Sequence, residues 1–215
     1  MSEENLTQVQ EAEQSSQDKE ATNPKSNKKQ NKNGEVVILN DDGTIKERHF
    51  YKDDKKNGET LIYKNGQLSQ RKIYKEDMLE GPVEIFKDGI MQLSTQYSEN
   101  QANGIGYFFN KAGILNAIAW YSNGVMDGPF FVFDDVGRLA KRDMYKNDEL
   151  NGTSISYHPN GMIFETGECK DNLKDGKWIM KDADGKLIQT TMYRAGGVVS
   201  RKKEDPKAKI KEESE

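Results

Sequence analysis

The sequence predicts an all-β protein, an elongated single-layer antiparallel β-meander built of about seven tandem hairpin repeats with disordered tails. Two observations predict this fold. Glycine recurs every 23 or 24 residues, and a second set of glycines lies within these intervals at short turn-like segments between apolar runs. A unit this short leaves no room for a helix between strands, so consecutive strands should pair antiparallel in one sheet.

The repeat is defined by three recurring positions. The first set of glycines starts each unit: Gly34, Gly58, Gly81, Gly104, Gly128, Gly152 and Gly176. The second set follows within the units: Gly43, Gly66, Gly89, Gly113, Gly137, Gly161 and Gly185. Eight residues later comes a Tyr in six units and Cys169 in the remaining one. The next unit starts seven residues after that position, so the variation in length lies between the two glycines.

Each unit is predicted to form a strand, a tight turn, a second strand and a longer turn. The first strand is rich in aromatic and β-branched residues, as in 59–63 and 130–133. The tight turns contain Asn-Gly or Asp-Gly, as at Asn65–Gly66, Asn160–Gly161 and Asp184–Gly185. These pairs accept positive φ, which a two-residue hairpin turn requires.

The second strand predicts how the units pack. An apolar residue lies two positions after the second Gly of each unit, as Leu68 does, and the strand ends at the Tyr position, here Tyr74. The two positions share parity, so we expect both side chains on one face of the sheet. Aromatic residues at the end of the first strand should fill the space between neighbouring tyrosines. These are Tyr63, Phe86, Phe109, Phe133 and Tyr157.

Composition predicts tails on both sides of the array. Residues 1–33 are Glu, Gln, Ser, Asn and Lys with almost no large apolar side chain, so this segment is predicted to be a disordered polar tail. Residues 34–199 form the predicted repeat domain. Residues 200–215 are predicted to be a charged disordered tail.

The repeat resembles a known family. Two clear examples are GETLIYKNGQLSQRKIYKEDMLEG (58–81) and GPFFVFDDVGRLAKRDMYKNDELNG (128–152). Their pattern is similar to the bacterial variant of the MORN repeat, found in YwqK-type proteins labelled as antitoxins, and the similarity covers about residues 34–199. The resemblance implies elongated antiparallel sheets, no cofactor and no catalytic residues. The antitoxin label implies a protein partner, specifically a toxin.

Three positions depart from the family pattern. Cys169 stands at a Tyr position, Lys181 stands where the first strand should end in an aromatic residue, and Ser200 stands where an eighth unit would start with Gly. The last two changes are typical of a capping unit, whose outer strand meets water.

Charge and composition exclude several function classes. Lys and Arg number 32 against 36 Asp and Glu, and the two signs alternate, so neither nucleic acid nor an anionic membrane surface is favoured as a partner. The N-terminus lacks the features of a secretory signal, and no apolar run is long enough to span a membrane. A cytoplasmic location is the expectation.

Residue types that carry chemistry are scarce. His49 and His158 lie more than four units apart, so they cannot form a metal pair or a catalytic dyad within one chain. We expect His158 to be a solvated turn residue and Cys169 to be a small residue filling a Tyr position. We therefore expect no enzyme activity, no metal and no cofactor.

One unit is much more apolar than the others. Apolar residues are 14 of 24 in unit 104–127, against 8 of 23 in unit 58–80. A sheet without helices cannot bury both faces of such a unit, so part of it should form an exposed patch that binds a partner. The candidate residues are Tyr107, Phe109, Ile118, Trp120 and Phe131. Two alternatives to a binding patch are that the unit is the best-packed centre of the array, or that the sheet curls and covers itself.

These expectations favour a non-catalytic repeat protein that binds a protein partner, as an antitoxin-like neutralising module or a scaffold. One alternative is a membrane-associated MORN-like scaffold, which would need a one-sided Lys or Arg patch. Another is an exported effector whose polar N-terminus is a transport signal.

Overall fold

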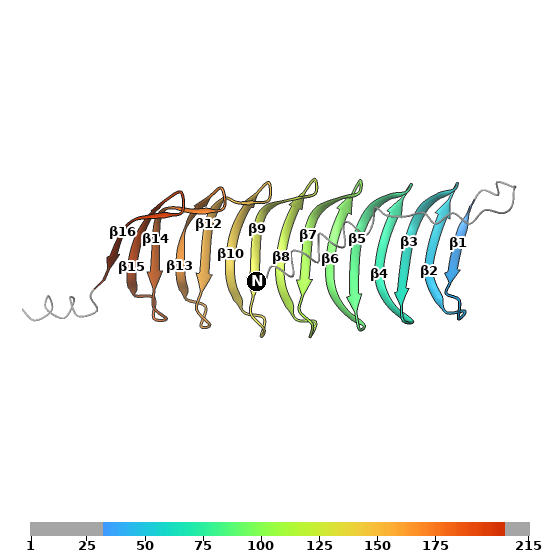
Figure 1. Cartoon of the computed structure of the whole chain (residues 1–215), viewed down its shortest axis with the longest axis horizontal. Helices are drawn as coiled ribbons and strands as arrows, with labels where there is room; N and C mark the ends of the chain where they lie inside the picture. Colours follow the sequence, from blue (N-terminus) through green and yellow to red (C-terminus); the bar gives the residue numbers. More distant parts are fainter. Residues whose placement is uncertain (1–31, 205–215) are drawn as a thin grey trace, which may run out of the picture. The chain divides into compact units, whose positions relative to one another are not determined.

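The computed structural model describes residues 32–204, which form one open antiparallel sheet of 16 strands without helices (Figure 1). This confirms the predicted all-β meander. In this part of the chain, no helix has the length and apolarity needed to cross a membrane. Residues 1–31 and 205–215, which hold most of the two predicted tails, lie outside the described residues.

Seven hairpins follow one another, and each strand pairs with the strands before and after it in the chain. The hairpins are β1 (Gly34–Leu39) with β2 (Ile45–Lys52), β3 (Lys55–Lys64) with β4 (Gln67–Lys75), β5 (Met78–Lys87) with β6 (Ile90–Ser98), β7 (Gln101–Phe109) with β8 (Leu115–Ser122), β9 (Val125–Phe133) with β10 (Leu139–Lys146), β12 (Gly152–Tyr157) with β13 (Ile163–Lys170), and β14 (Leu173–Lys181) with β15 (Leu187–Arg194).

Two strands depart from this simple scheme. The short β11 (Glu149–Leu150) pairs only with β10, just before β12 begins. The last strand, β16 (Gly197–Lys203), pairs with β15 and continues past residue 199, the predicted end of the repeat domain.

The hairpin turns have two lengths, which explains the two unit lengths. In the 23-residue units, Asn65–Gly66 and Asp88–Gly89 form two-residue turns with positive φ at both positions, as a type I′ turn requires. In the 24-residue units, only the Gly of the turn has positive φ. The prediction of positive φ at Asn160 and Asp184 is therefore wrong, because one added residue lets the Gly alone reverse the chain.

The longer hairpin turn is stabilised by the residue at its start. In the turn between β9 and β10, the Asp134 carbonyl accepts a hydrogen bond from Gly137 N at 2.9 Å. Asp134 Oδ1 accepts a further bond from Arg138 N at 2.9 Å. The bond to Oδ1 favours the ionised carboxylate, so the pKa of Asp134 is lowered, and the backbone of Arg138 is the largest cause. Asn110 and Asp182 make the equivalent side-chain bonds, to Ile114 N and Lys186 N, in their turns.

The first glycine of most units lies at a β-bulge within its strand. In β3, the pairing changes from Thr60 with His49 to Lys56 with Tyr51, so two extra residues lie on β3. Gly58, in this segment, has φ +117°. A Cβ atom there would lie 3.1 Å from Cβ of Phe50. Both the φ value and the close approach require glycine, and such a bulge bends the strand, as the curved strands of Figure 1 show.

The connections between hairpins join each unit to the one before it. In the turn Glu76–Asp77, both residues have positive φ. Asp77 N donates to the Lys56 carbonyl at 2.9 Å, and Lys56 N donates to Asp77 Oδ1 at 2.6 Å. The same reciprocal pair of bonds links Asn100 with Leu79, Asp148 with Met126 and Asn172 with Leu150.

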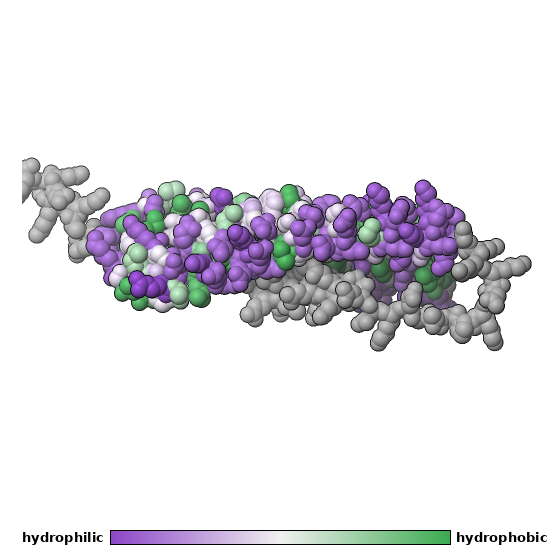
Figure 2. Space-filling view, turned by 90° about the horizontal axis from the view of Figure 1, so that it is seen from above, coloured by the Kyte–Doolittle hydropathy of each residue, from purple (hydrophilic) through white to green (hydrophobic). Residues whose placement is uncertain are grey.

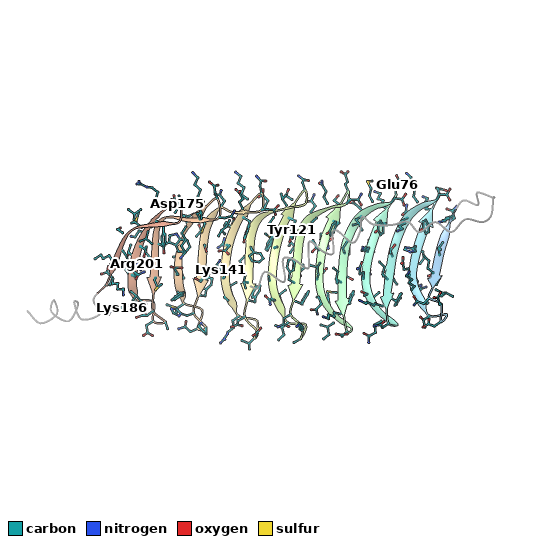
Figure 3. All side chains as sticks on the ribbon, viewed as in Figure 1. Glu76, Tyr121, Lys141, Asp175, Lys186 and Arg201 are labelled. Atoms are coloured by element: carbon teal, nitrogen blue, oxygen red, sulfur yellow. The ribbon has the colours of Figure 1, made fainter. Side chains whose placement is uncertain are left out.

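These turns form a hydrogen-bonded row along one long side of the sheet, at the strand ends opposite the hairpin turns. This side is the upper one in Figure 3, where Glu76 and Asp175 are labelled, whereas Lys186 lies on the opposite side with the hairpin turns. Seen from above, the residues visible along it are mostly hydrophilic, and hydrophobic ones gather towards the end that carries β16 (Figure 2).

The core lies on one face, which we call the inner face. A row of buried residues crosses it through strand-to-strand pairing: His49, Thr60, Lys72, Val83, Thr95, Gly106, Ala119, Phe130 and Asp143. Its apolar centre is Ala117, Ala119, Met126 and Phe130, and the rings of Tyr121 and Tyr145 pack against it. Residues that alternate with this row lie on the outer face.

A register shift near each hairpin turn makes the parity prediction wrong. In the β3–β4 hairpin, Ile62 pairs with Gln70 but Tyr63 pairs with Leu68, so the alternation is interrupted between Leu68 and Tyr74. The apolar position after the second Gly is accordingly poorly buried at the ends of the array, where Ile45 is 38% and Leu187 36% exposed.

The neighbours of the tyrosines also differ from the prediction. Tyr74 pairs with Leu79, Tyr97 with Ala102 and Tyr121 with Met126, so the start of the next strand lies beside each ring. The aromatic residues at the ends of the first strands do not fill this space. The reason is the antiparallel pairing: Tyr63 pairs with Leu68 beside the hairpin turn, whereas Tyr74 pairs with Gly58 at the other end of the two strands.

Candidate protein-binding surface

All five candidate residues lie on the outer face of β7–β9, and we call them the aromatic patch. Tyr107 pairs with Ile118, which pairs with Phe131, so three of them form one row across three strands. Phe109 lies two residues beyond Tyr107 on β7, and Trp120 two residues beyond Ile118 on β8, which places both on the same face. Apolar composition singled out these five residues, and the pairing of β7–β9 places them on one face.

Contacts within the aromatic patch fix its ring positions. The rings of Trp120 and Phe131 meet edge to face, with their centroids 5.6 Å apart. Trp120 also lies against the β9 bulge, because a Cβ atom on Gly128 would be 3.0 Å from Cβ of Trp120. Tyr107 is 38% exposed, and the other four residues are half-buried. Rigid, partly exposed aromatic side chains lose little conformational entropy on binding.

The opposite side of the same strands is the best-packed part of the sheet. Ala117 and Ala119 of β8 and Phe130 of β9 are buried on the inner face, one residue away from members of the aromatic patch. An exposed patch and a packed centre are therefore compatible, because they lie on different faces. The unit is the packed centre of the array on its inner face and presents aromatic rings on its outer face.

The outer face changes character towards β1. There, Arg71 donates to Glu59 Oε1 at 2.5 Å and to Glu84 Oε2 at 3.2 Å, and Arg48 pairs with Glu35. These carboxylates hold the pKa of Arg71 above its ordinary value, and the hydrogen bond to Glu59 is the largest cause. The same row of the outer face thus runs from ion pairs on β1–β5 to aromatic rings on β7–β9.

Sequence reasoning missed a cation beside the aromatic patch. Arg142 on β10 pairs with Phe131, and its guanidinium carbon lies 6.0 Å from the centroid of that ring. Within residues 32–204 its guanidinium forms no ion pair. The repeat alignment could have found it, because Arg142 and Ile118 both lie three residues before the Tyr of their units.

His49, His158 and Cys169 belong to the residue types that most often bind metals or act in catalysis. Within residues 32–204, no three His, Cys, Asp or Glu side chains are placed to hold a metal ion. Cys169 is buried, and burial raises the pKa of its thiol, which opposes formation of the nucleophilic thiolate. His158 is not the solvated residue that the sequence predicts: its Nε2 lies 2.9 Å from the Lys181 carbonyl, and its ring meets Phe164 edge to face.

Comparison with known proteins identifies the repeat. Residues 150–171 and 174–195 match the MORN repeat variant, so the chain contains repeats of this type. The two matched segments each start two residues after a connection between hairpins, Asn147–Asp148 or Asp171–Asn172. They cover β12–β13 and nearly all of β14–β15, two consecutive hairpins of the sheet. No curated protein matches the chain significantly.

Proposed function

We propose that this MORN-variant repeat protein is non-catalytic, acts in the cytoplasm and binds a protein partner through the aromatic patch on β7–β9. The observation that carries the proposal is the cross-strand row Tyr107–Ile118–Phe131, which presents aromatic and aliphatic side chains side by side on the outer face. Contiguous exposed apolar groups are typical of protein interaction sites, and aromatic residues dominate the binding energy of such sites.

The surroundings of the patch indicate the chemistry of the partner. Arg142 adds a positive charge that is not neutralised by an ion pair within the described chain. On the outer face of β3–β5, the carboxylates of Glu59 and Glu84 are already paired with Arg71. A partner surface with an apolar centre and a carboxylate at its rim therefore complements this region, and the charged region beside it excludes purely apolar partners.

Site-specific photocrosslinking in cells tests the location. A photoreactive phenylalanine analogue replaces Tyr107, and a matched control places it at Leu61, which has the same position two units earlier on the same face. We expect covalent adducts with a defined protein from position 107 only. The same adducts from both positions, or none from position 107, would contradict the proposal.

Affinity for the captured partner then tests the energetics. Tyr107→Ser and Trp120→Lys should each weaken binding at least about tenfold, because truncating an aromatic anchor commonly costs more than about 1.4 kcal/mol. Leu61→Ser should leave binding unchanged. Equal affinity of Trp120→Lys and the wild-type chain, with the fold intact by circular dichroism, would remove the patch from the interface.

We propose a protein toxin as the first partner class to test, because the repeat resembles that of proteins labelled as antitoxins. Co-expression with a captured partner that arrests growth should restore growth, and Tyr107→Ser should abolish the rescue. Sedimentation with vesicles of neutral and anionic lipids distinguishes the membrane-scaffold alternative, and fractionation of cells distinguishes the exported effector.

A further inference from the structure

A buried lysine interrupts the inner-face row near its N-terminal end. Lys72 is 8% exposed and lies between Thr60 and Val83 in the strand-to-strand pairing. Its ammonium forms no hydrogen bond or ion pair within residues 32–204. Lysine is rarely buried to this extent without a partner, because removing an ammonium from water is costly.

A second charged residue buried in the same row, Asp143, has partners within the fold, unlike Lys72. Asp143 is 2% exposed, and its carboxylate accepts a hydrogen bond from Ser154 Oγ at 2.6 Å and pairs with Lys141 Nζ at 2.6 Å. Asp143 and Lys72 occupy the same position of their units, two residues before the Tyr. One charge has partners within the fold, and the other lacks them.

The surroundings of Lys72 are cationic. Burial is the main cause that lowers the pKa of Lys72, and the charge of Lys56 lowers it further. The same two effects, in the same order, lower the pKa of His49, whose ring lies next in the row beyond Thr60. Glu47 opposes both shifts, but its Oε2 atom is already 2.9 Å from His49 Nε2.

The ammonium of Lys72 remains within reach of solvent. Among the described residues, every side-chain nitrogen or oxygen that is fully buried has a hydrogen-bond partner. The unpartnered ammonium is therefore not sealed in the core. Lys56 lies across from Tyr51, and its Nζ atom is 5.2 Å from the centroid of the Tyr74 ring, so a second ammonium lies at the same end of the inner face.

We propose that Lys72 and Lys56 form an anion site on the inner face of β2–β5, which binds a small oxyanion, a phosphate or carboxylate group. Two ammonium groups supply hydrogen-bond donors and positive charge, which an oxyanion matches. Thr60 lies directly across from Lys72 in the row, and its hydroxyl oxygen Oγ1 is 3.2 Å from His49 Nδ1. This site lies on the face opposite the aromatic patch and goes beyond the proposed function.

Thermal unfolding of the full chain in inorganic phosphate, acetate or chloride of equal ionic strength tests the proposal. Millimolar phosphate should raise Tm by about 2–4 °C relative to chloride, because a ligand that binds only the folded state stabilises it. Phosphate also stabilises proteins through general exclusion from their surfaces, so the variants decide the result. The phosphate-specific shift should disappear in Lys72→Met and Lys56→Met, and it should persist in Lys75→Met, which removes an exposed charge from the same strand.

Each outcome has a defined meaning. A shift with acetate that is also lost in Lys72→Met extends the site to carboxylates, whereas a shift with phosphate alone restricts it to phosphate groups. Equal shifts in wild type, Lys72→Met and Lys75→Met would overturn the proposal, as would equal Tm values in all three salts. Because Tyr107→Ser should leave the phosphate shift unchanged, failure of this site and failure of the protein-binding proposal are distinguishable.

Discussion

The centre of the sheet, β7–β10, and its N-terminal third, β1–β5, share one backbone and differ in chemistry on both faces. On the inner face, the centre buries Ala119 and Phe130, whereas equivalent strands near the N-terminus bury His49, Thr60 and Lys72. The repeated bulges, turns and pairing register therefore do not depend on which side chains fill the row. The array tolerates polar inner residues because its backbone hydrogen bonds are local to neighbouring strands.

The outer faces differ in the same way. Arg71 at the N-terminal end is held by two carboxylates, and Arg142, at the same position of its unit, lies over an aromatic ring. On the outer face of the N-terminal third, Arg71 is neutralised by neighbouring carboxylates. The centre leaves apolar and charged groups available for a partner.

The largest expected effect is loss of the central core. Phe130→Ala should destabilise the protein by about 3 kcal/mol, because it removes a large buried ring. Thr60→Ala, the matched substitution at the same position of an N-terminal unit, should cost about 1 kcal/mol through loss of one hydrogen bond. Urea unfolding at equilibrium measures both values. Equal losses would mean that the two regions do not differ in packing.

Replacing the bulge glycines tests the shared backbone. Gly128→Ala and Gly58→Ala should each cost about 1–3 kcal/mol, because φ is +132° and +117° and a Cβ atom would approach the preceding strand to 3.0 Å and 3.1 Å. The two losses should be similar, since the backbone is the same in both regions. Asp127→Ala, at an exposed neighbour, serves as the control and should stay within about 0.5 kcal/mol of wild type. Loss of stability in Gly128→Ala but not in Gly58→Ala would show that the two regions do not share the same bulge constraint.

Removing the buried charge should stabilise the N-terminal third. Lys72→Met should raise the free energy of unfolding by about 1 kcal/mol at pH 7 in chloride, because a partly desolvated ammonium without a partner in the fold is replaced by an apolar side chain.

The pH dependence provides an independent check on Lys72. Its pKa is lower in the folded than in the unfolded protein, so between these two values the unfolded state binds more protons. Wild-type stability should therefore rise with pH towards the ordinary lysine value of about 10.5, and the difference from Lys72→Met should shrink over that window. A difference that stays constant would contradict the burial of a charged Lys72.

The smallest effect concerns the outer ion pairs. Arg71→Met should cost about 0.5 kcal/mol at low salt and less at high salt, because partly exposed ion pairs contribute little and are screened. Arg142→Met should leave the free energy of unfolding unchanged within about 0.5 kcal/mol, since no ion pair is lost. Urea unfolding at two salt concentrations separates the two variants. A larger loss for Arg142→Met would show that this guanidinium is structural rather than available to a partner.

Much of the fold followed from spacing, and the exceptions have a common cause. The glycine and tyrosine positions predicted seven hairpins and their order. Apolar composition singled out Tyr107, Ile118 and Phe131, and the strand pairing then placed them in one row on one face. The predicted side of Leu68 was wrong because a one-residue register shift lies between it and Tyr74. The parity argument assumes that side chains alternate strictly between the two faces along a strand, and the extra residue of a bulge interrupts that alternation.

The sequence by itself determined the repeat, the strand order and the turn positions, because these depend on local preferences for positive φ and on periodic apolar residues. The tertiary structure decided which row is buried, how a turn such as Glu76–Asp77 bonds to the preceding unit, and that Lys72 is buried without a partner. Those features depend on residues about 20 positions apart that meet only when bulged strands stack, and no short-range pattern specifies that geometry.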